Sequence, residues 1–435
     1  MPCPRTPVDE FVDALHAQDV ERVRALLDGH AEVRAAVNAP IGDFDSRPVH
    51  AAKKNLPLLD LLLAHGADLN LKSAWWAGGF GVLEYDCTPE EAAPLIARGA
   101  IVDVFAAAHL GMFDRVRALV DADPSLVHAR GGDGKTPLHC ARTVESAEYL
   151  LDRGADLDAR DVDHESTAAQ YLVRDAPAVT RRLVERGAWA DVFIAVGLRD
   201  AALAERCLRD DPGALDHRIG RGKYRVAHDG ARPAARDEIG DRRGDIYRWV
   251  FDHNIGAMDV AAMLRYDDVL ARLERHATAA ERLLAACARG DRPRAEAIVS
   301  ADPEIVARLT PEQARTLTDR AHANDVPAVA LMLDLGFDPR AIGDDSGDAL
   351  HWAAFQGSAA MVRLLLEHDP AIGVRDAHYG GTALDWCLFG AVHGWAKDRG
   401  DFAATARLLR DAGERFDPVR APTGRDDVDA VLGKD

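Results

Sequence analysis

Four side chains that can transfer protons stand in segments where the repeating pattern of this chain is interrupted. They are His164, Glu165, His253 and His393. An imidazole or a carboxylate can act as a general acid or base when its surroundings bring its pKa near the working pH. These four residues are therefore the candidate catalytic residues, and the sequence does not rank them.

The same interrupted segments are rich in aromatic side chains, which offer large contact surfaces to a ligand or a partner. The candidate ligand-binding residues are Trp75, Trp76, Phe80, Tyr247, Trp249, Asn254, His351, Trp352, Tyr379 and Trp395. The alternative is that inserted loops need aromatic anchors to pack against the rest of the protein. Both interpretations stay open at each of these positions.

The sequence predicts neither a metal site nor a cofactor. It contains no His-x-x-His or Glu-x-x-His pair, although ligands one helical turn apart are typical of metal sites on helices. Residues 131–136 look like part of a phosphate-binding loop, but the first glycine of such a loop would fall at Ala129. A turn before a helix explains this segment better.

A seven-residue element recurs along the chain at a fixed spacing. Its first copy is Leu62-Leu63-Ala64-His65-Gly66-Ala67-Asp68. The glycine of this element returns from Gly66 to Gly99, and again from Gly154 to Gly187, at intervals of about 33 residues, the period of a helix-turn-helix unit that carries a β-turn finger. The repetition predicts a solenoid of stacked helix pairs.

A second motif completes the repeat unit. Residues 133–141 read Asp-Gly-Lys-Thr-Pro-Leu-His-Cys-Ala, with a tight turn, Thr136 as N-cap and Pro137 in the first helical position. Together the two motifs resemble the ankyrin repeat, and the resemblance extends from about Phe11 to Phe416. It implies an all-α ankyrin-repeat solenoid of roughly 11–12 repeats.

The ankyrin resemblance also implies where the candidate site residues lie. In an ankyrin solenoid the finger tips and inner helices line a concave groove, and the candidate residues would converge there. His50, His139 and His351 occupy the Leu-His slot of the repeat, in which the imidazole braces the finger backbone. His351 stays a binding candidate as well, because Trp352 adjoins it.

A longer period groups the repeats into four blocks that each begin with a fingerless helix pair. Phe105 and Phe193 belong to such pairs and should be buried. The predicted blocks are 1–103 with the Trp-Trp loop, 104–191, 192–282 with a long finger insertion at 221–251, and 283–418 with an insertion at 390–401, before a flexible tail at 419–435. The apolar residues at 246–251 include strand formers, which favours an elongated finger or lid.

Composition restricts the partners and the compartment. The formal net charge is −19, which argues against nucleic acid and anionic membranes, since both are bound mainly by Lys and Arg. No apolar run approaches the roughly 18 residues of a membrane span. The cysteines are scattered, without a Cys-x-x-Cys pair, and this pattern predicts a reducing, cytoplasmic location.

Two functional hypotheses follow. The first is a recognition scaffold that holds a partner protein or peptide in its concave groove. The alternative is an enzyme that processes a small molecule at an acid/base site built from the inserted histidine, glutamate and tryptophan residues. The chain also resembles bacterial multi-repeat ankyrin proteins with insertions of the types Trp-Trp-Ala-Gly-Gly-Phe-Gly, Asp-Val-Asp-His-Glu-Ser-Thr and His-Gly-Trp, a resemblance that secures no activity.

Overall fold

The computed structural model describes residues 6–343, 346–416 and 422–433. Within these ranges every regular element is a helix, and β structure is confined to two isolated bridges, Arg160–Thr167 and Arg218–Gly256. The predicted all-α class is therefore confirmed. The chain divides into two compact units: unit 1 comprises Met1–Leu198 and Gly220–Val250, and unit 2 comprises Arg199–Ile219 and Phe251–Asp435.

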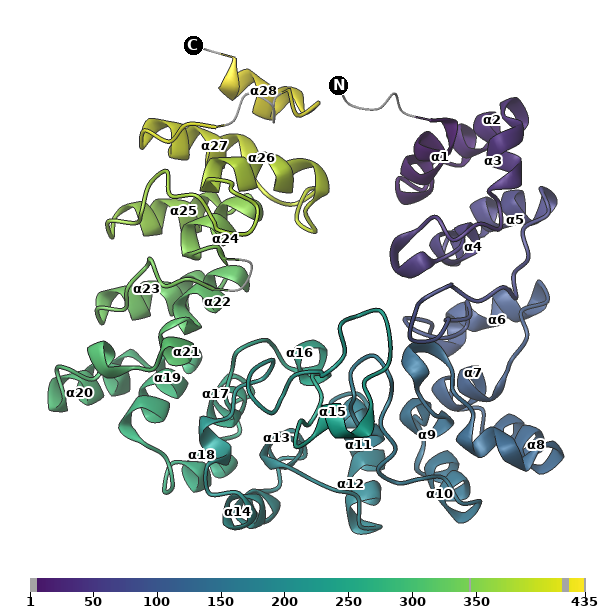
Figure 1. The fold of residues 1–435 in the computed structure, drawn as a ribbon, viewed down its shortest axis with the longest axis horizontal. Helices are drawn as coiled ribbons and strands as arrows, with labels where there is room; N and C mark the ends of the chain where they lie inside the picture. Colours follow the sequence, from purple (N-terminus) through teal and green to yellow (C-terminus); the bar gives the residue numbers. More distant parts are fainter. Residues whose placement is uncertain (1–5, 344–345, 417–421, 434–435) are drawn as a thin grey trace. The chain divides into compact units, whose positions relative to one another are not determined.

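Unit 1 is built mainly from consecutive helix pairs, in which an inner helix contacts the outer helix that follows it (Figure 1). Its helices are α1 (Pro7–His16), α2 (Val20–Gly29), α3 (Ala31–Ala35), α4 (Pro48–Ala52), α5 (Leu56–Ala64), α6 (Pro89–Ala97), α7 (Val104–His109), α8 (Phe113–Ala122), α9 (Pro137–Cys140), α10 (Val144–Asp152), α11 (Ala168–Leu172), α12 (Pro177–Glu185), α13 (Val192–Gly197), α15 (Arg236–Ile239) and α16 (Tyr247–Val250).

Unit 2 repeats the same pairing of helices. Its helices are α14 (Ala201–Asp210), α17 (Ala257–Met263), α18 (Asp267–Leu273), α19 (Ala279–Arg289), α20 (Arg292–Ala301), α21 (Pro311–Ala314), α22 (Thr316–His322), α23 (Val326–Asp334), α24 (Ala349–Phe355), α25 (Ala359–Leu366), α26 (Ala383–His393), α27 (Phe402–Asp411) and α28 (Asp426–Leu432). In the part of the chain that the structure describes, no helix is both long and apolar enough to cross a membrane.

Local sequence signals set where the helices begin. Thr88 caps α6 in a capping box with Glu91, and Thr310 caps α21 in the same way with Gln313. In both helices a proline follows the cap, where its missing N–H leaves no hydrogen bond unmade. Both helix starts are therefore set by residues within four positions of one another in the sequence.

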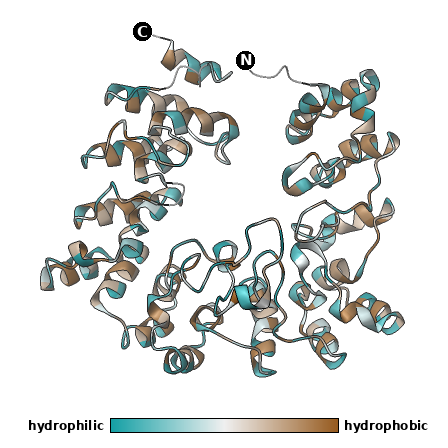
Figure 2. Ribbon diagram, in the orientation of Figure 1, coloured by the Kyte–Doolittle hydropathy of each residue, from teal (hydrophilic) through white to brown (hydrophobic). Residues whose placement is uncertain are grey.

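The outer helices bury one leucine at the same position of each repeat. Leu62, Leu95, Leu150 and Leu183 are all 0% exposed. Figure 2 shows hydrophobic and hydrophilic residues mixed along these helices, because one stripe of each amphipathic helix packs and the other is solvated. The repeat register read from the sequence is therefore confirmed at these positions.

Two interruptions of the repeat also follow the sequence prediction. The turn between α6 and α7 has no room for a finger, and Phe105 and Phe193 are buried as expected. Between α5 and α6 the structure contains no helix over residues 65–88, so the Trp-Trp segment is a loop. An added Cβ at Gly78, where φ is +134°, would lie 2.2 Å from the Gly131 carbonyl oxygen, so only glycine allows this loop to pack so closely.

The long insertion differs from the prediction in two ways. Residues 246–251 do not extend as a strand or finger, because Tyr247–Val250 form the helical turn α16, which contacts α11. Tyr247 and Val250, three residues apart, lie on one face of this turn and are buried. The insertion also belongs to unit 1 while its flanks belong to unit 2, so the compact units do not follow the predicted boundaries of the third block.

Two further segments are more helical than predicted. The insertion at 390–401 begins inside α26, which continues to His393. The predicted flexible tail is wrong for Asp426–Leu432, which form α28. Val428 of this helix is fully buried in the core of unit 2, because α28 packs against α27. Residues 417–421 and 434–435 of the terminal segment lie outside the described residues.

Candidate functional site

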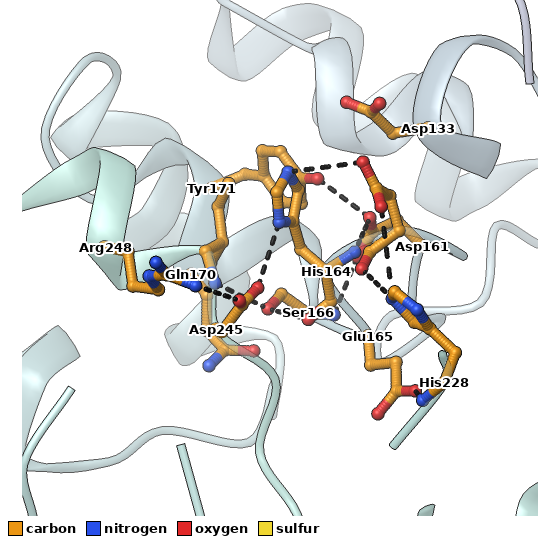
Figure 3. Close-up of polar contacts among 12 residues, drawn as sticks. Asp133, Asp161, His164, Glu165, Ser166, Gln170, Tyr171, His228, Asp245 and Arg248 are labelled. Atoms are coloured by element: carbon orange, nitrogen blue, oxygen red, sulfur yellow. Dashed lines mark hydrogen bonds and ion pairs between the residues drawn. The ribbon is translucent and has the colours of Figure 1, made fainter. Parts of the chain in front are cut away.

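Three interrupted segments of the sequence meet in unit 1, and Figure 3 shows two of them, the finger with Asp161 and His164 and the long insertion with His228 and Asp245. The Trp-Trp loop reaches the finger at 160–167, because Trp75 Nε1 donates a hydrogen bond to Asp163 Oδ2 at 3.2 Å. The long insertion reaches the same finger, because the Asp245 backbone N–H donates to the His164 carbonyl at 3.0 Å. We call the polar residues at this meeting point the polar cluster: Asp133, Asp161, Asp163, His164, Tyr171 and Asp245.

Asp161 organises the finger of the polar cluster. Its carboxylate accepts the backbone N–H groups of His164 and Ser166, each at 2.7 Å, and the Tyr171 hydroxyl at 2.9 Å. The residue is 4% exposed. Burial raises the pKa of Asp161 to about 6, although His164 and these hydrogen bonds oppose the rise. Asp161 is thus a buried support for the finger.

His164 is held in one orientation by the long insertion. Its Nδ1 donates to Asp245 Oδ1 at 3.0 Å, and its Nε2 lies 3.9 Å from Asp163 Oδ2. Burial lowers the pKa of His164, but the Asp245 hydrogen bond and the nearby carboxylates raise it by more, so the net shift is upward. An imidazole oriented by a carboxylate can hold a proton or ligate a metal with its other nitrogen.

Asp133 faces the cluster from the preceding finger. It is 8% exposed, and its Oδ2 lies 3.4 Å from Lys135 Nζ. Burial raises the pKa of Asp133, and Lys135 opposes the rise only in part. The Lys135 ammonium also lies over the rings of Phe80 and Tyr171, at 5.1 and 5.6 Å. Phe80, predicted to bind a ligand, thus contacts a cation of the protein itself.

Glu165 does not behave as a free acid or base. It is 2% exposed, and its carboxylate accepts the backbone N–H groups of Ala227 and His228 at 2.9 to 3.1 Å. His228 in turn packs its ring 4.8 Å from Trp76. Glu165 therefore ties the long insertion to the finger, and the structure argues against its predicted catalytic role.

The aromatic candidates of unit 1 split into exposed and buried residues. Trp249 is 64% exposed, whereas Trp75 and Trp76 are partly buried between the loops. Tyr247 is 0% exposed, and its hydroxyl donates to Asp191 at 2.9 Å. This side chain therefore anchors the insertion to the core instead of facing a groove.

The candidates at the start of unit 2 are also structural. Asn254 is 0% exposed; its amide donates to Asp319 and to the Glu312 carbonyl, and its own carbonyl accepts the guanidinium of Arg218. Both polar groups of its side chain are used in hydrogen bonds inside the protein. His253 is partly buried, and its Nδ1 lies 4.0 Å from Asp319.

Unit 2 carries a second collection of aromatic side chains on its inner helices α22, α24 and α26. Trp395 packs against Phe355 with ring centroids 4.8 Å apart, and Trp352 contacts Trp386 at 5.0 Å. Phe389 lies beside His393 at 4.7 Å. We call this collection the aromatic surface: His322, Trp352, Phe355, Trp386, Phe389, His393 and Trp395.

Exposure differs sharply across the aromatic surface. Trp352 and Trp386 are 8% and 6% exposed, whereas Phe389 and Trp395 are 52% and 53% exposed. His393 is also exposed. Tyr379, 59% exposed, lies at the edge, with its ring 6.0 Å from Trp386. A buried aromatic bed therefore supports exposed aromatic side chains.

His351 is a brace of the finger. It is 2% exposed; its Nδ1 pairs with Asp348 at 2.8 Å and its Nε2 donates to the Gly381 carbonyl at 3.3 Å. His139 and His50 bond neighbouring fingers and loops in the same manner. The bracing contact predicted for this slot is present in all three repeats, and both ring nitrogens of His351 are engaged within the protein.

The structure thus brings the candidates together in two sets, one in each unit. The sequence analysis missed most of the polar cluster: Asp133, Asp161, Asp163, Tyr171 and Asp245. Two of these residues adjoin His164 in the segment Asp161-Val162-Asp163-His164, and this acidic run was the available signal. No sequence signal pointed to Asp245, because it lies 81 residues from its partner His164.

Comparisons with known proteins identify the repeat. Residues 133–162 match a family model for the ankyrin repeat, and residues 317–366 match a model for multiple ankyrin repeats. Protein PhlB of Serratia liquefaciens is 37% identical over 99 residues, which is 21% of this chain and 44% of that protein. The serine/threonine-protein kinase VIK of Arabidopsis thaliana is 44% identical over 57 residues, 12% of this chain and 13% of the kinase.

These curated relatives are each matched over less than half of their own length. Among solved structures, the ankyrin repeat domain of human ASB11 aligns with 17% identity over 72% of this chain and 99% of that domain, at a TM-score of 0.28. A score at this level adds nothing to the fold assignment. The assignment depends instead on the matched repeats and on the helix pairs.

Proposed function

We propose that this ankyrin-repeat protein is a recognition scaffold whose aromatic surface in unit 2 binds a peptide segment of a partner protein. Ankyrin repeats generally mediate protein binding, and the finer assignment rests on one observation. Trp395 and Phe389 are more than half exposed although they adjoin a buried aromatic bed. Exposed aromatic side chains on a rigid support are typical of interaction sites.

The bed distinguishes this surface from loose loop packing. Trp352 and Phe355 lie on α24, and Trp386 lies on α26, so helices fix the positions of the rings beneath Trp395. An anchor that only fastened the insertion would bury its ring. Trp395 instead leaves half its surface in water, where a partner can cover it.

Charge indicates the composition of the bound segment. The chain has a formal net charge of −19, which attracts basic partners and repels acidic ones. The exposed indole of Trp395 can also bind a cation over its face. We therefore propose a segment in which Lys or Arg alternates with large apolar residues, the composition that satisfies both features.

A peptide library tests this proposal with a matched control. Labelled peptides of basic-apolar, neutral-apolar and acidic-apolar composition would be titrated with the full chain by fluorescence polarisation. We expect selection of the basic-apolar class, and we expect Trp395→Ala to weaken binding at least tenfold. Trp249→Ala should leave binding unchanged, because Trp249 is also more than half exposed but lies in unit 1. Equal losses in the two variants, or no selection among the classes, would overturn the proposal.

The enzyme alternative is best supported at His164. This candidate has a carboxylate within hydrogen-bonding distance of one ring nitrogen, and its other nitrogen lies 3.9 Å from Asp163. This observation favours a chemical function at the polar cluster but names no reaction. We further propose a cytoplasmic location, which suits the free thiols of Cys87, Cys140, Cys207, Cys287 and Cys387.

A further inference from the structure

The polar cluster of unit 1 places three metal-ligating side chains around one point. Asp133, Asp163 and His164 each offer one ligand atom, and these atoms all lie within 4.8 Å of one another. Ligands of one tetrahedral zinc ion lie at about 2.0–2.2 Å from the metal, so two of them are separated by about 3.3–3.6 Å. His164 Nε2 and Asp163 Oδ2, 3.9 Å apart, are close to this separation, and side-chain rotations of up to about 1 Å would bring all three atoms to bonding distance.

The set of ligands is mixed, with one imidazole and two carboxylates. Imidazole suits zinc, iron, copper and nickel, and carboxylates complete such sites in many proteins. His164 Nε2 is the available nitrogen, because Nδ1 bonds Asp245 at 3.0 Å. The closest carboxylate to Nε2, that of Asp163, lies 3.9 Å away, beyond a hydrogen bond. The two groups are too far apart to share a proton in a hydrogen bond, but their separation is near that of two ligands of one metal ion.

Neighbouring residues hold each of the three ligands. Asp245 orients His164 in the carboxylate–histidine arrangement that is characteristic of metal centres. Trp75 Nε1 donates to Asp163 Oδ2 at 3.2 Å, and Lys135 lies 3.4 Å from Asp133 Oδ2. These contacts come from the Trp-Trp loop, the long insertion and the Asp133 finger. These contacts restrict the orientations of the three ligands and hold them near one point.

The charge of the cluster also favours a cation. Four carboxylates, those of Asp133, Asp161, Asp163 and Asp245, lie around the His164 imidazole. Two cations offset part of this charge, because Lys135 Nζ lies 3.4 Å from Asp133 and the Arg248 guanidinium lies 3.5 Å from Asp245 (Figure 3). A divalent ion at this point would compensate the excess.

We propose that unit 1 binds one divalent transition-metal ion, of the zinc class, through carboxylate oxygens of Asp133 and Asp163 and through His164 Nε2. The site joins two consecutive fingers and, by way of Asp245, the long insertion. Three protein ligands leave a coordination position for water or for a partner's carboxylate. The proposal is independent of peptide binding at the aromatic surface of unit 2.

Calorimetry on the full chain tests metal binding directly. The protein would be treated with a chelator, dialysed and titrated separately with Zn²⁺, Mn²⁺ and Ca²⁺. We expect one tight Zn²⁺ per chain, weaker Mn²⁺ and no comparable Ca²⁺ binding, because an imidazole ligand disfavours Ca²⁺. Zinc affinity should rise with pH, since the ion competes with a proton for His164.

Variants assign the ligands. His164→Gln and Asp133→Asn should each remove the tight site, and Asp245→Asn should weaken it by roughly 10- to 100-fold, as loss of a supporting residue does. His276→Gln removes an exposed histidine in unit 2, outside both the polar cluster and the aromatic surface, and should leave the zinc affinity unchanged. Because a substitution in the cluster can disturb folding, crystals of the unchanged protein soaked in Zn²⁺ give a second measurement, an anomalous difference peak among the three side chains.

Several outcomes would overturn the proposal. They are the absence of a stoichiometric zinc site in the unchanged chain, equal affinity for Ca²⁺, an anomalous peak elsewhere, or tight binding that survives in well-folded His164→Gln. In each case His164 would be a charged partner of the surrounding carboxylates, and the cluster would serve only to fasten the insertions.

Discussion

The insertions of both units contain aromatic and histidine residues, but the surroundings of these side chains differ between the two units. In unit 1 the Trp-Trp loop and the long insertion are bound down by side-chain hydrogen bonds, such as Trp75 to Asp163 and His164 to Asp245. In unit 2 the insertion leaves Trp395 and His393 exposed above a bed of buried rings. An inserted aromatic or histidine is thus a fastener where polar partners surround it, and a contact surface where only rings do.

The two units also differ at the histidine position of the repeat. His139 in unit 1 and His351 in unit 2 both brace a finger, but the N-cap residue beside His139 is Thr136 and the one beside His351 is Asp348. Burial lowers the pKa of His139 to about 3. Burial also lowers the pKa of His351, but the hydrogen bond to Asp348, the charge of that carboxylate and the contact with Gly381 together raise it by more. The carboxylate at the cap thus shifts the pKa of one brace in the direction opposite to that of the other.

The largest expected effect separates the bed from the exposed rings within unit 2. Trp386→Ala should lower the free energy of unfolding by about 3–5 kcal/mol, because it empties a buried site, whereas Trp395→Ala should cost less than about 1 kcal/mol. Urea denaturation followed by circular dichroism gives both values. If Trp395→Ala destabilised the chain as much as Trp386→Ala, the aromatic surface would be packing alone.

A smaller effect tests the fastening in unit 1. Asp245→Ala should lower the free energy of unfolding by about 1–3 kcal/mol, because it leaves His164 partly buried without its partner. Asp241→Ala, an exposed position on the same insertion, is the matched control and should stay within about 0.5 kcal/mol of the parent. Measurements in chelator keep any bound metal out of the comparison. Indistinguishable variants would show that the long insertion is not held through His164.

The smallest effect concerns the two braces and pH. The raised pKa of His351 means that its contribution to stability is complete below its unfolded pKa of about 6.5 and is lost as pH rises through the folded value. The lowered pKa of His139 has the opposite sign: its contribution is present above about pH 6.5 and is lost as pH falls toward about 3. The two braces thus oppose each other.

Exchanging one cap separates these two contributions. Asp348→Thr should turn His351 into a neutral brace, lower its pKa and cost about 1 kcal/mol, because a charge-assisted hydrogen bond becomes a neutral one. Histidine ring protons followed by NMR across the pH range report each pKa, with His139 as the internal reference. A pKa of His351 that does not move would show that Asp348 is not its cause.

Much of the repeat could be predicted from sequence because its signals are local. The spacing of Gly66 and Gly99 gave the register, and Leu62 and Leu95 are buried accordingly. Thr88 and Thr310 cap helices as their neighbours indicated. Local signals failed at Tyr247–Val250 and at Asp426–Leu432, where apolar residues became helical only because the rest of their unit offered a surface to pack against.

The sequence by itself determined the stacking unit, since neighbouring repeats interact through residues at fixed offsets and leave a periodic record. It also determined which segments depart from that period. The tertiary structure alone decided which departures meet: Asp245 reaches His164 across 81 residues, and Trp75 reaches Asp163 across 88. Contacts between loops obey no period, so neither the polar cluster nor its possible ion could be read from spacing. The tertiary structure also decided which aromatic side chains are exposed, because Trp386 and Trp395 differ only in the neighbours that cover them.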